Sequence, residues 1–277
     1  MRLGRIGYIN CYPVYGAIDR GIVSVDADLV TGTPSELNGL LAAGELDVSV
    51  VSAVEYARNA GAYQLLPDLA ISCDGPVQSV ALFSHCDARE LDGATVLTSA
   101  SSRTSIHLLE LLCSDVWNVT PKFVAVRTEA GDIDALAELP HEAVLVIGDA
   151  ALLLAARGIY AHRYDLGQMW KEWTGLPFVF AVWAARREGR GPNYLDRVRQ
   201  VHGGLIASRE WGLTNVDVLA QAAGEKTGLG FAECREYLSG LDYALSHRHL
   251  EGLTGFFRRL AARGTVPEGT LSFLSVA

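Results

Sequence analysis

Short apolar segments with the pattern of strands alternate with segments that have the pattern of helices over about the first 190 residues. Strands are expected at 5–9, 26–30 and 46–52, each followed by a helix. Further strands are expected at 76–84, 94–100, 122–126 and 177–186. This rhythm predicts βαβ units, in which a parallel sheet carries helices on its faces. The sequence therefore predicts an α/β fold.

Two helix starts have well-defined capping signals. Thr33 can cap a helix, Pro34 suits its first turn, and Glu36 completes a capping box. Ser52 and Glu55 form a second S-x-x-E box directly after the strand expected at 46–52. Each box predicts a helix that begins at the end of a strand or of an extended segment.

The last third of the chain has a different pattern, because four helical segments follow one another there. We expect two lobes, the first made of residues 1–84 and 182–277 and the second of residues 85–181. The strands at 79–84 and 178–184 are expected to cross from one lobe to the other. The predicted fold is thus a two-lobed α/β fold with a ligand cleft between the lobes.

Composition restricts the classes of partner. The chain has 277 residues, 49% of them hydrophobic, and a formal net charge of −9. A nucleic acid or an anionic membrane attracts a basic surface, so neither partner is expected. No apolar run reaches the roughly 18 residues of a membrane span, and a strand is expected directly after Met1 and Arg2 in place of a secretory signal. We therefore expect a cytoplasmic protein.

The cysteines and the common motifs favour neither a metal site nor a nucleotide site. Five cysteines are present, an odd number, and no two of them form a C-x-x-C pair, so we expect neither a disulfide framework nor a metal site. There is no G-x-G-x-x-G, P-loop or G-x-S-x-G motif, and "GEKTG" at 224–228 lacks the spacing of a P-loop.

Hydroxyl side chains gather where the strand at 94–100 gives way to a helix. The stretch "TSASSRTS" at 98–105 contains six of them: Thr98, Ser99, Ser101, Ser102, Thr104 and Ser105. Free backbone N–H groups and the helix dipole favour an anion at such a position, and Arg103 adds positive charge. Helix capping is the alternative, although it requires only one or two hydroxyls.

Three other junctions are candidates for ligand contacts. Ser52 and the amide of Ala53 open a helix and form either a second anion site or a simple cap. Gly148 permits close backbone approach, and Asp149 beside it is expected to be an N-cap rather than a general base. Asn10 follows the first strand on a loop restrained by proline, where it either contacts a ligand or caps the next helix.

Several long motifs occur in a fixed order: "GYINCYPV", "PSELNGLLAAGELDVSVVSAVEYA", "PVQSVALFS", "SSRTS", "VLVIGDAAL" and "YDLGQMWKEWTGLPFVFAVWAAR". Together they resemble the chorismate dehydratases of menaquinone biosynthesis by the futalosine pathway, from residue 3 to about 186. The resemblance implies a type II periplasmic-binding-protein-like fold used as a cytoplasmic lyase. It also implies dehydration of chorismate to 3-[(1-carboxyvinyl)oxy]benzoate without a metal or organic cofactor.

The resemblance also suggests roles for individual residues. Asn10 and Ser79 match the positions that the resemblance assigns to a catalytic polar pair, and Thr104 and Ser105 match the positions that it assigns to anion donors. No strong base is evident, so we hypothesise that a carboxylate of the substrate accepts the proton. The oligomeric state and the role of Cys11 stay open.

Two other functions stay open. One is the sibling enzyme that makes 1,4-dihydroxy-6-naphthoate, which shares the fold. The other is a non-catalytic solute-binding protein for a small carboxylate, which the lack of a signal peptide and lipobox cysteine disfavours.

Overall fold

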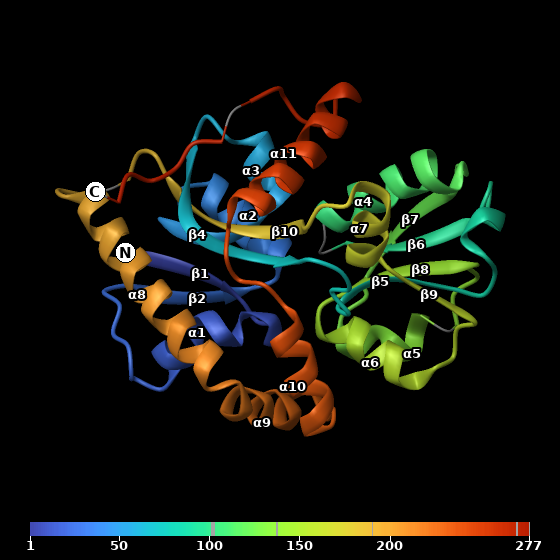
Figure 1. Cartoon of the computed structure of the whole chain (residues 1–277), viewed down its shortest axis with the longest axis horizontal. Coiled ribbons are helices and arrows are strands. Elements are labelled where there is room, and N and C mark those ends of the chain that lie inside the picture. Colours follow the sequence, from blue (N-terminus) through green and yellow to red (C-terminus); the bar gives the residue numbers. More distant parts are fainter. Residues whose placement is uncertain (101–102, 137, 190, 270, 277) are drawn as a thin grey trace. The chain divides into compact units, whose positions relative to one another are not determined.

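In the computed structural model the described residues are 1–100, 103–136, 138–189, 191–269 and 271–276. The chain divides into two compact units. Unit 1 consists of Met1–Ser72 and Val179–Ala277, and unit 2 of Cys73–Phe178. Each unit contains a five-stranded sheet, and Figure 1 shows the strands of both sheets with their helices.

The sheet of unit 1 has the strand order β2-β1-β3-β10-β4. Its strands are β1 (Arg2–Ile6), β2 (Asp28–Gly32), β3 (Val48–Ser52), β4 (Tyr63–Cys73) and β10 (Phe178–Arg186). β1 pairs in parallel with β2 and β3, whereas β10 runs antiparallel to β3. The helices of the unit are η1 (Ile9–Cys11), α1 (Tyr12–Asp19), α2 (Pro34–Ala42), α3 (Ala53–Arg58), α8 (Tyr194–Thr214), α9 (Val216–Thr227), α10 (Phe231–Gly240) and α11 (His247–Ala262).

The sheet of unit 2 has the strand order β7-β6-β8-β5-β9. Its strands are β5 (Val80–Ser84), β6 (Thr95–Ser99), β7 (Lys122–Val126), β8 (Ala143–Ile147) and β9 (His162–Asp165). β6 is parallel to β7 and β8, and β5 is antiparallel to β8 and β9. The helical segments are η2 (Ala88–Glu90), α4 (Thr104–Leu112), η3 (Cys113–Trp117), η4 (Ala130–Asp132), α5 (Ile133–Leu136), α6 (Asp149–Arg157) and α7 (Leu166–Thr174).

The predicted α/β class and the predicted start of α2 are confirmed. The backbone N–H of Thr33 donates to Glu36 Oε2 at 2.8 Å, and the Thr33 side chain accepts from the Glu36 N–H, so the capping box is complete. The start of α3 has half of its box. Ser52 Oγ accepts from the Glu55 N–H at 3.2 Å, while the Glu55 carboxylate binds the Asn59 side chain.

The first strand is shifted from the expected 5–9, because β1 is Arg2–Ile6 and Ile9–Cys11 form η1.

Two further expectations about strands are wrong. The sheets are mixed rather than parallel, because β10 and β5 run against their neighbours. β4 is an 11-residue strand that the pattern does not predict. Pro67 and Asp68 in its middle are typical of a turn, and Asp68 does have a positive φ of 56°. Arg209 from α8 donates to the backbone carbonyl and the carboxylate of Asp68, which stabilises this irregular point within a continuous strand.

Buried aromatic side chains with satisfied polar atoms fix the centre of each unit. In unit 1 the Trp183 Nε1–H donates to Tyr15 Oη at 2.9 Å, and Tyr15 donates to the Gly4 carbonyl at 2.9 Å. Burial raises the pKa of Tyr15, so it stays a neutral donor. In unit 2 Trp170 donates to the Pro177 carbonyl at 3.1 Å and packs edge-on against Phe178. These contacts hold β1 and β10 against α1 in unit 1, and α7 against the start of β10 in unit 2.

Candidate functional site

Unit 1 carries polar residues at one edge of its sheet. β1 and β3 are parallel neighbours, with Leu3 opposite Val48, so both strands end at the same edge. Asn10 lies in η1, shortly after β1, and Ser52 is the last residue of β3. The parallel pairing thus places two of the predicted site residues beyond adjacent strand ends, where ligands bind in α/β sheets.

The loop that carries Asn10 is held by buried neighbours. Tyr243 donates its hydroxyl to the Asn10 carbonyl at 2.9 Å, and burial raises the pKa of Tyr243 well above its ordinary value, so it stays a donor. Pro13 lies in the first turn of α1. The backbone of Pro13 contacts α8 so closely that a Cβ at Gly212 would lie 2.1 Å from the Pro13 oxygen.

Asn10 does not cap the next helix. The N-cap position of α1 is Cys11, and no side chain caps that helix. The side-chain oxygen Oδ1 of Asn10 is buried and has no hydrogen-bond partner among the described residues. Buried polar atoms nearly always have a partner, so this oxygen is an acceptor that a ligand donor would satisfy.

Ser52 has a capping role and a buried partner that the sequence did not reveal. Its side chain accepts from the Glu55 N–H, as the capping alternative expects. Asn38 of α2, which is 1% exposed, donates to Ser52 Oγ and accepts from the Ser52 N–H, both at 3.3 Å. Ala53, the first residue of α3, is fully buried. The amide of Asn38 therefore fixes the end of β3.

Unit 2 gathers its predicted residues at one edge of its sheet. β5 is antiparallel to β8, with Val80 opposite Ile147, so the residues before β5 lie beside those after β8. The Gly148 N–H donates to the Ser79 carbonyl at 2.7 Å. Since β6 is parallel to β8, its carboxyl end and α4 follow the same edge. Ser79, Gly148, Asp149, Thr104 and Ser105 therefore all follow or precede strand ends at this edge.

The expectation that Asp149 is an N-cap is wrong. Gly148 occupies the N-cap position of α6, with φ 66° and ψ −148°, a conformation that only glycine adopts without strain. Asp149 is the first residue of the helix and is 7% exposed. A carboxylate in the first turn is favoured by the helix dipole.

The hydroxyls at the start of α4 lie inside its first turn. Arg103 occupies the N-cap position and its side chain makes no capping bond. Thr104 and Ser105 are 2% and 4% exposed. Thr98 and Ser99 are buried at the end of β6, and Ser101 and Ser102 lie outside the described residues.

Asp165, which the sequence analysis did not select, holds the backbone directly before Ser79 in place. Asp165 accepts from the backbone N–H groups of Val77 at 3.0 Å and Gln78 at 2.6 Å. The same carboxylate caps α7 through the N–H groups of Gly167 and Gln168. An Asp before a helical segment is a capping signal, but its second role depends on chain 87 residues away and has no local signal.

Other kinds of site are not evident in the part of the chain that the structure describes. There, no group of three or more His, Cys, Asp or Glu side chains is placed to hold a metal ion. None of the helices searched among these residues is both long and apolar enough for a membrane span.

The sequence is similar to a known protein family and to a named enzyme. The family model described as menaquinone biosynthesis matches residues 1–262. A chorismate dehydratase from Thermus thermophilus is 33% identical over 242 residues, which are 82% of this chain and 84% of that protein.

Solved structures show the fold. Protein AF1704 from Archaeoglobus fulgidus superposes with a TM-score of 0.77 at 19% identity, over 96% of this chain and 98% of that one. The alkanesulfonate-binding protein SsuA from Xanthomonas axonopodis pv. citri superposes with a TM-score of 0.69 at 15% identity, over 97% and 94% of the two chains. The fold is therefore that of the periplasmic binding proteins, as the resemblance of the motifs implied.

Proposed function

The chain belongs to the menaquinone biosynthesis family, and on this premise we propose that it is a hydro-lyase that dehydrates chorismate. The product is 3-[(1-carboxyvinyl)oxy]benzoate, and the reaction belongs to the futalosine pathway in the cytoplasm. The observation that carries the proposal is the 33% identity to a chorismate dehydratase over 82% of the chain.

The chemistry of the reaction defines what a site must supply. Chorismate loses the hydrogen at C3 and the hydroxyl at C4, and formation of an aromatic ring drives the loss. The C3 hydrogen is acidified through the ring diene by the ring carboxylate, on which negative charge builds. Donors fixed in position around that carboxylate and around the leaving hydroxyl therefore lower the barrier.

We assign the reacting end of the substrate to the edge of unit 1. The unpartnered Oδ1 of Asn10 accepts the hydrogen of the C4 hydroxyl, and the amide NH₂ donates to the leaving oxygen or to a carboxylate. Tyr243 donates to the backbone carbonyl of Asn10, so the backbone that carries the amide is held in place before the substrate arrives. Ser52 and Ala53 contribute a second polar position on the same edge.

We assign binding of a substrate carboxylate to the edge of unit 2. Thr104 and Ser105 lie in the first turn of α4, where hydroxyls and backbone N–H groups favour an anion, and Arg103 precedes them. Ser79 adjoins Gly148 and Asp149 through the backbone bond from Gly148 to Ser79. In this assignment Ser79 completes the catalytic polar pair with Asn10. A substrate carboxylate accepts the C3 proton and passes it to the departing C4 hydroxide, so that water leaves.

The proposal is tested by incubating the purified chain with chorismate. We expect an aromatic product, followed by its absorbance, with a mass lower than that of chorismate by one water. Binding of chorismate in a calorimeter without any change in mass would mean that the chain is a binding protein. If the chain does not react with chorismate but forms 1,4-dihydroxy-6-naphthoate from the sibling enzyme's substrate, it has the sibling enzyme's activity.

A further inference from the structure

Ser79 of unit 2 lies between two residues with unusual backbone conformations. Gln78, directly before it, has a positive φ of 62°. Gly148, whose N–H donates to the Ser79 carbonyl at 2.7 Å, has φ 66° and ψ −148°. Backbone strain gathers at functional sites and persists where the surrounding structure compensates for it. The proposed reaction gives no role to Gln78, so its strained conformation needs an explanation.

Gln78 is the central residue of a γ-turn. The Ser79 N–H donates to the Val77 carbonyl at 2.8 Å, and such an i→i+2 bond around a residue of positive φ is typical of the classic γ-turn, the rare and strained form. Ser79 Oγ lies 3.5 Å from the same carbonyl oxygen. The turn therefore determines how the backbone of Ser79 enters β5, which begins at Val80.

Two side chains of β9 hold the turn. The Gln78 N–H donates to Asp165 Oδ2 at 2.6 Å, and the Gln78 carbonyl accepts from Arg163 Nη2 at 2.8 Å. The other oxygen of the carboxylate, Asp165 Oδ1, accepts from the Val77 N–H at 3.0 Å. Each of these hydrogen bonds involves a charged group, which makes it about twice as strong as a bond between neutral groups. Together they stabilise the strained turn.

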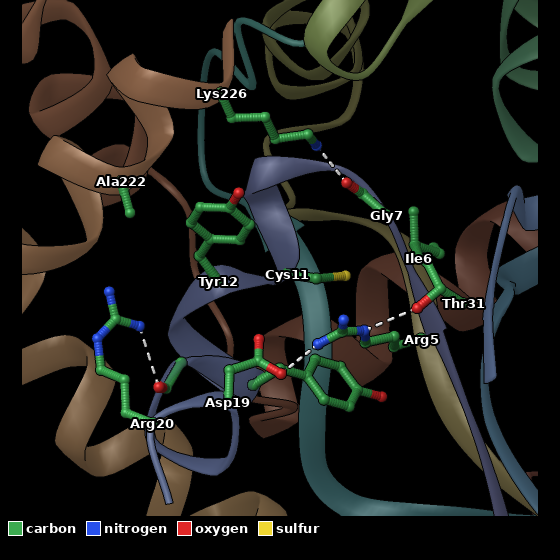
Figure 2. A pocket seen from close by; sticks show the side chains of 12 residues that line it. Arg5, Ile6, Gly7, Cys11, Tyr12, Asp19, Arg20, Thr31, Ala222 and Lys226 are labelled. Atoms are coloured by element: carbon green, nitrogen blue, oxygen red, sulfur yellow. Dashed lines mark hydrogen bonds and ion pairs between the residues drawn. The ribbon is translucent and has the colours of Figure 1, made fainter. Parts of the chain in front are cut away.

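The loop that follows β1 in unit 1 also carries a predicted site residue, but it is held without such strain. Figure 2 shows the hydrogen bond that Lys226 donates to the Gly7 carbonyl of this loop. No residue from 5 to 13, a range that the structure describes in full, has a positive φ. A polar residue after or before a strand therefore does not itself require a strained turn, and the turn at Gln78 needs a reason specific to Ser79.

From these contacts we propose that the γ-turn at Gln78, held by Arg163 and Asp165, positions Ser79 for the reaction. The inference rests on the proposed function, in which Ser79 belongs to the catalytic pair, and it adds two positioning residues that act through the turn. A turn that relaxed to a negative φ would move the Ser79 hydroxyl relative to the start of α6. Turnover would then fall, although β5 keeps its pairing from Val80 onward.

Two variants that both remove the Gln78 amide test the backbone conformation alone. Glycine adopts a positive φ without strain, whereas the β-branched valine disfavours it. We expect kcat for chorismate in Gln78→Val to be about tenfold below that in Gln78→Gly, with similar KM. Asn118→Gly and Asn118→Val are the matched control pair, because Asn118 has a positive φ of 56° in the same unit but follows η3. Their kcat values are expected to be equal.

Asp165→Asn tests the carboxylate that holds the turn. Its remaining oxygen can still accept from the N–H groups of Val77, Gly167 and Gln168, which all bind Oδ1. Its NH₂ group replaces Oδ2 and opposes the Gln78 N–H. We expect kcat to fall by about tenfold or more. Adding Gln78→Gly to this variant is expected to restore part of the loss, because glycine lowers the strain of the turn.

Thermal melts of all variants show whether each one folds, and Gln78→Ala replaces Gln78→Val if the latter unfolds early. If the wild-type chain turns over chorismate but the two Gln78 variants have equal kcat, the positioning role is overturned and the proposed function stands. A difference of the same size in the Asn118 pair, or a double variant as slow as Asp165→Asn alone, would also overturn the positioning role. A wild-type chain without turnover would contradict the proposed function and this role together.

Discussion

The polar edges of the two units are built in different ways. The edge of unit 1 presents the side chains of Asn10 and Ser52. Tyr243 holds the backbone carbonyl of Asn10, and the buried Asn38 holds the hydroxyl and the N–H of Ser52. The edge of unit 2 presents the starts of two helices and a glycine, so its donors are largely backbone N–H groups and first-turn hydroxyls. A side-chain amide both accepts and donates hydrogen bonds, so it suits a substrate group whose bonds change during the reaction. A helix start suits a substrate carboxylate whose negative charge stays the same. From this comparison we propose that Asn10 of unit 1 controls turnover and that the start of α4 in unit 2 controls binding.

The largest effect is expected from Asn10→Asp. Asp has nearly the same size but replaces the amide donor by a carboxylate that only accepts, so the leaving hydroxyl loses its donor. Losing one preorganised donor of this kind costs about 10²–10³ in rate. Steady-state turnover of chorismate, with a thermal melt beside it, measures the effect. An unchanged kcat would show that Asn10 has only a packing role. If the melt shows early unfolding, Asn10→Ser becomes the deciding variant, since it keeps a donor but has a shorter reach.

The second effect concerns binding in unit 2. Thr104→Ala and Ser105→Ala each remove a hydrogen bond to a charged group, worth about 1.5–3 kcal/mol, which is roughly ten- to a hundredfold in affinity. The donors act on ground state and transition state alike, so KM is expected to rise with little change in kcat. A KM that stays at the wild-type value in both variants would show that these hydroxyls only stabilise the start of α4.

The third effect concerns stability at the start of α6. Gly148→Ala forces a side chain into φ 66° and ψ −148°, which costs about 1–3 kcal/mol in the free energy of unfolding. Urea denaturation measures this change, and Gly158→Ala is a control at a positive φ of 59° in the ordinary left-handed region at the other end of α6. A loss at Gly148 no larger than that at Gly158 would contradict the argument from its unusual conformation.

The smallest effect is expected from Tyr243→Phe. The variant removes the hydrogen bond to the Asn10 carbonyl and leaves the carbonyl without its donor, at a cost of about 0.5–1.5 kcal/mol. Because Tyr243 acts on the position of Asn10, kcat is expected to fall several-fold while KM changes little. Tyr194→Phe is the comparison, because Tyr194 is a buried tyrosine of the same unit whose hydroxyl donates to the carbonyls of Asp47 and Arg186 and not to that of Asn10. An equal fall in kcat for both variants would mean that the effect comes from general loss of packing.

Features of this fold that depend on neighbouring residues could be predicted from the sequence, and features that depend on distant contacts could not. The capping box at Thr33 follows from neighbouring residues and appears as expected. β4 does not, because Pro67 and Asp68 are typical of a turn, and the groups that bind Asp68 within the strand, Arg209 and the N–H of Leu245, lie more than 100 residues away in the sequence. The same holds for the antiparallel direction of β5 and β10, which is set by pairing with β8 and β3.

The residues of the candidate site also fall into those that local patterns reveal and those that depend on distant contacts. Asn10, Thr104 and Gly148 could be selected because each follows a predicted strand. The groups that hold the edges in place could not, since Tyr243 and Asn38 belong to no local motif and contact Asn10 and Ser52 from 233 and 14 residues away. Asp165 has a capping signal, but its bonds to Val77 and Gln78 depend on the fold of unit 2.

The division of roles between the two edges is tested most directly by turnover at saturating chorismate. Thr104→Ala and Asn10→Asp are compared with the wild-type chain, with binding of chorismate to each measured by calorimetry. The account predicts that Thr104→Ala reaches nearly the wild-type kcat once enough chorismate is present. It predicts that Asn10→Asp binds chorismate yet stays about 10²–10³ slower at any concentration. A wild-type kcat for Asn10→Asp, or a kcat for Thr104→Ala that stays equally low at saturation, would contradict it.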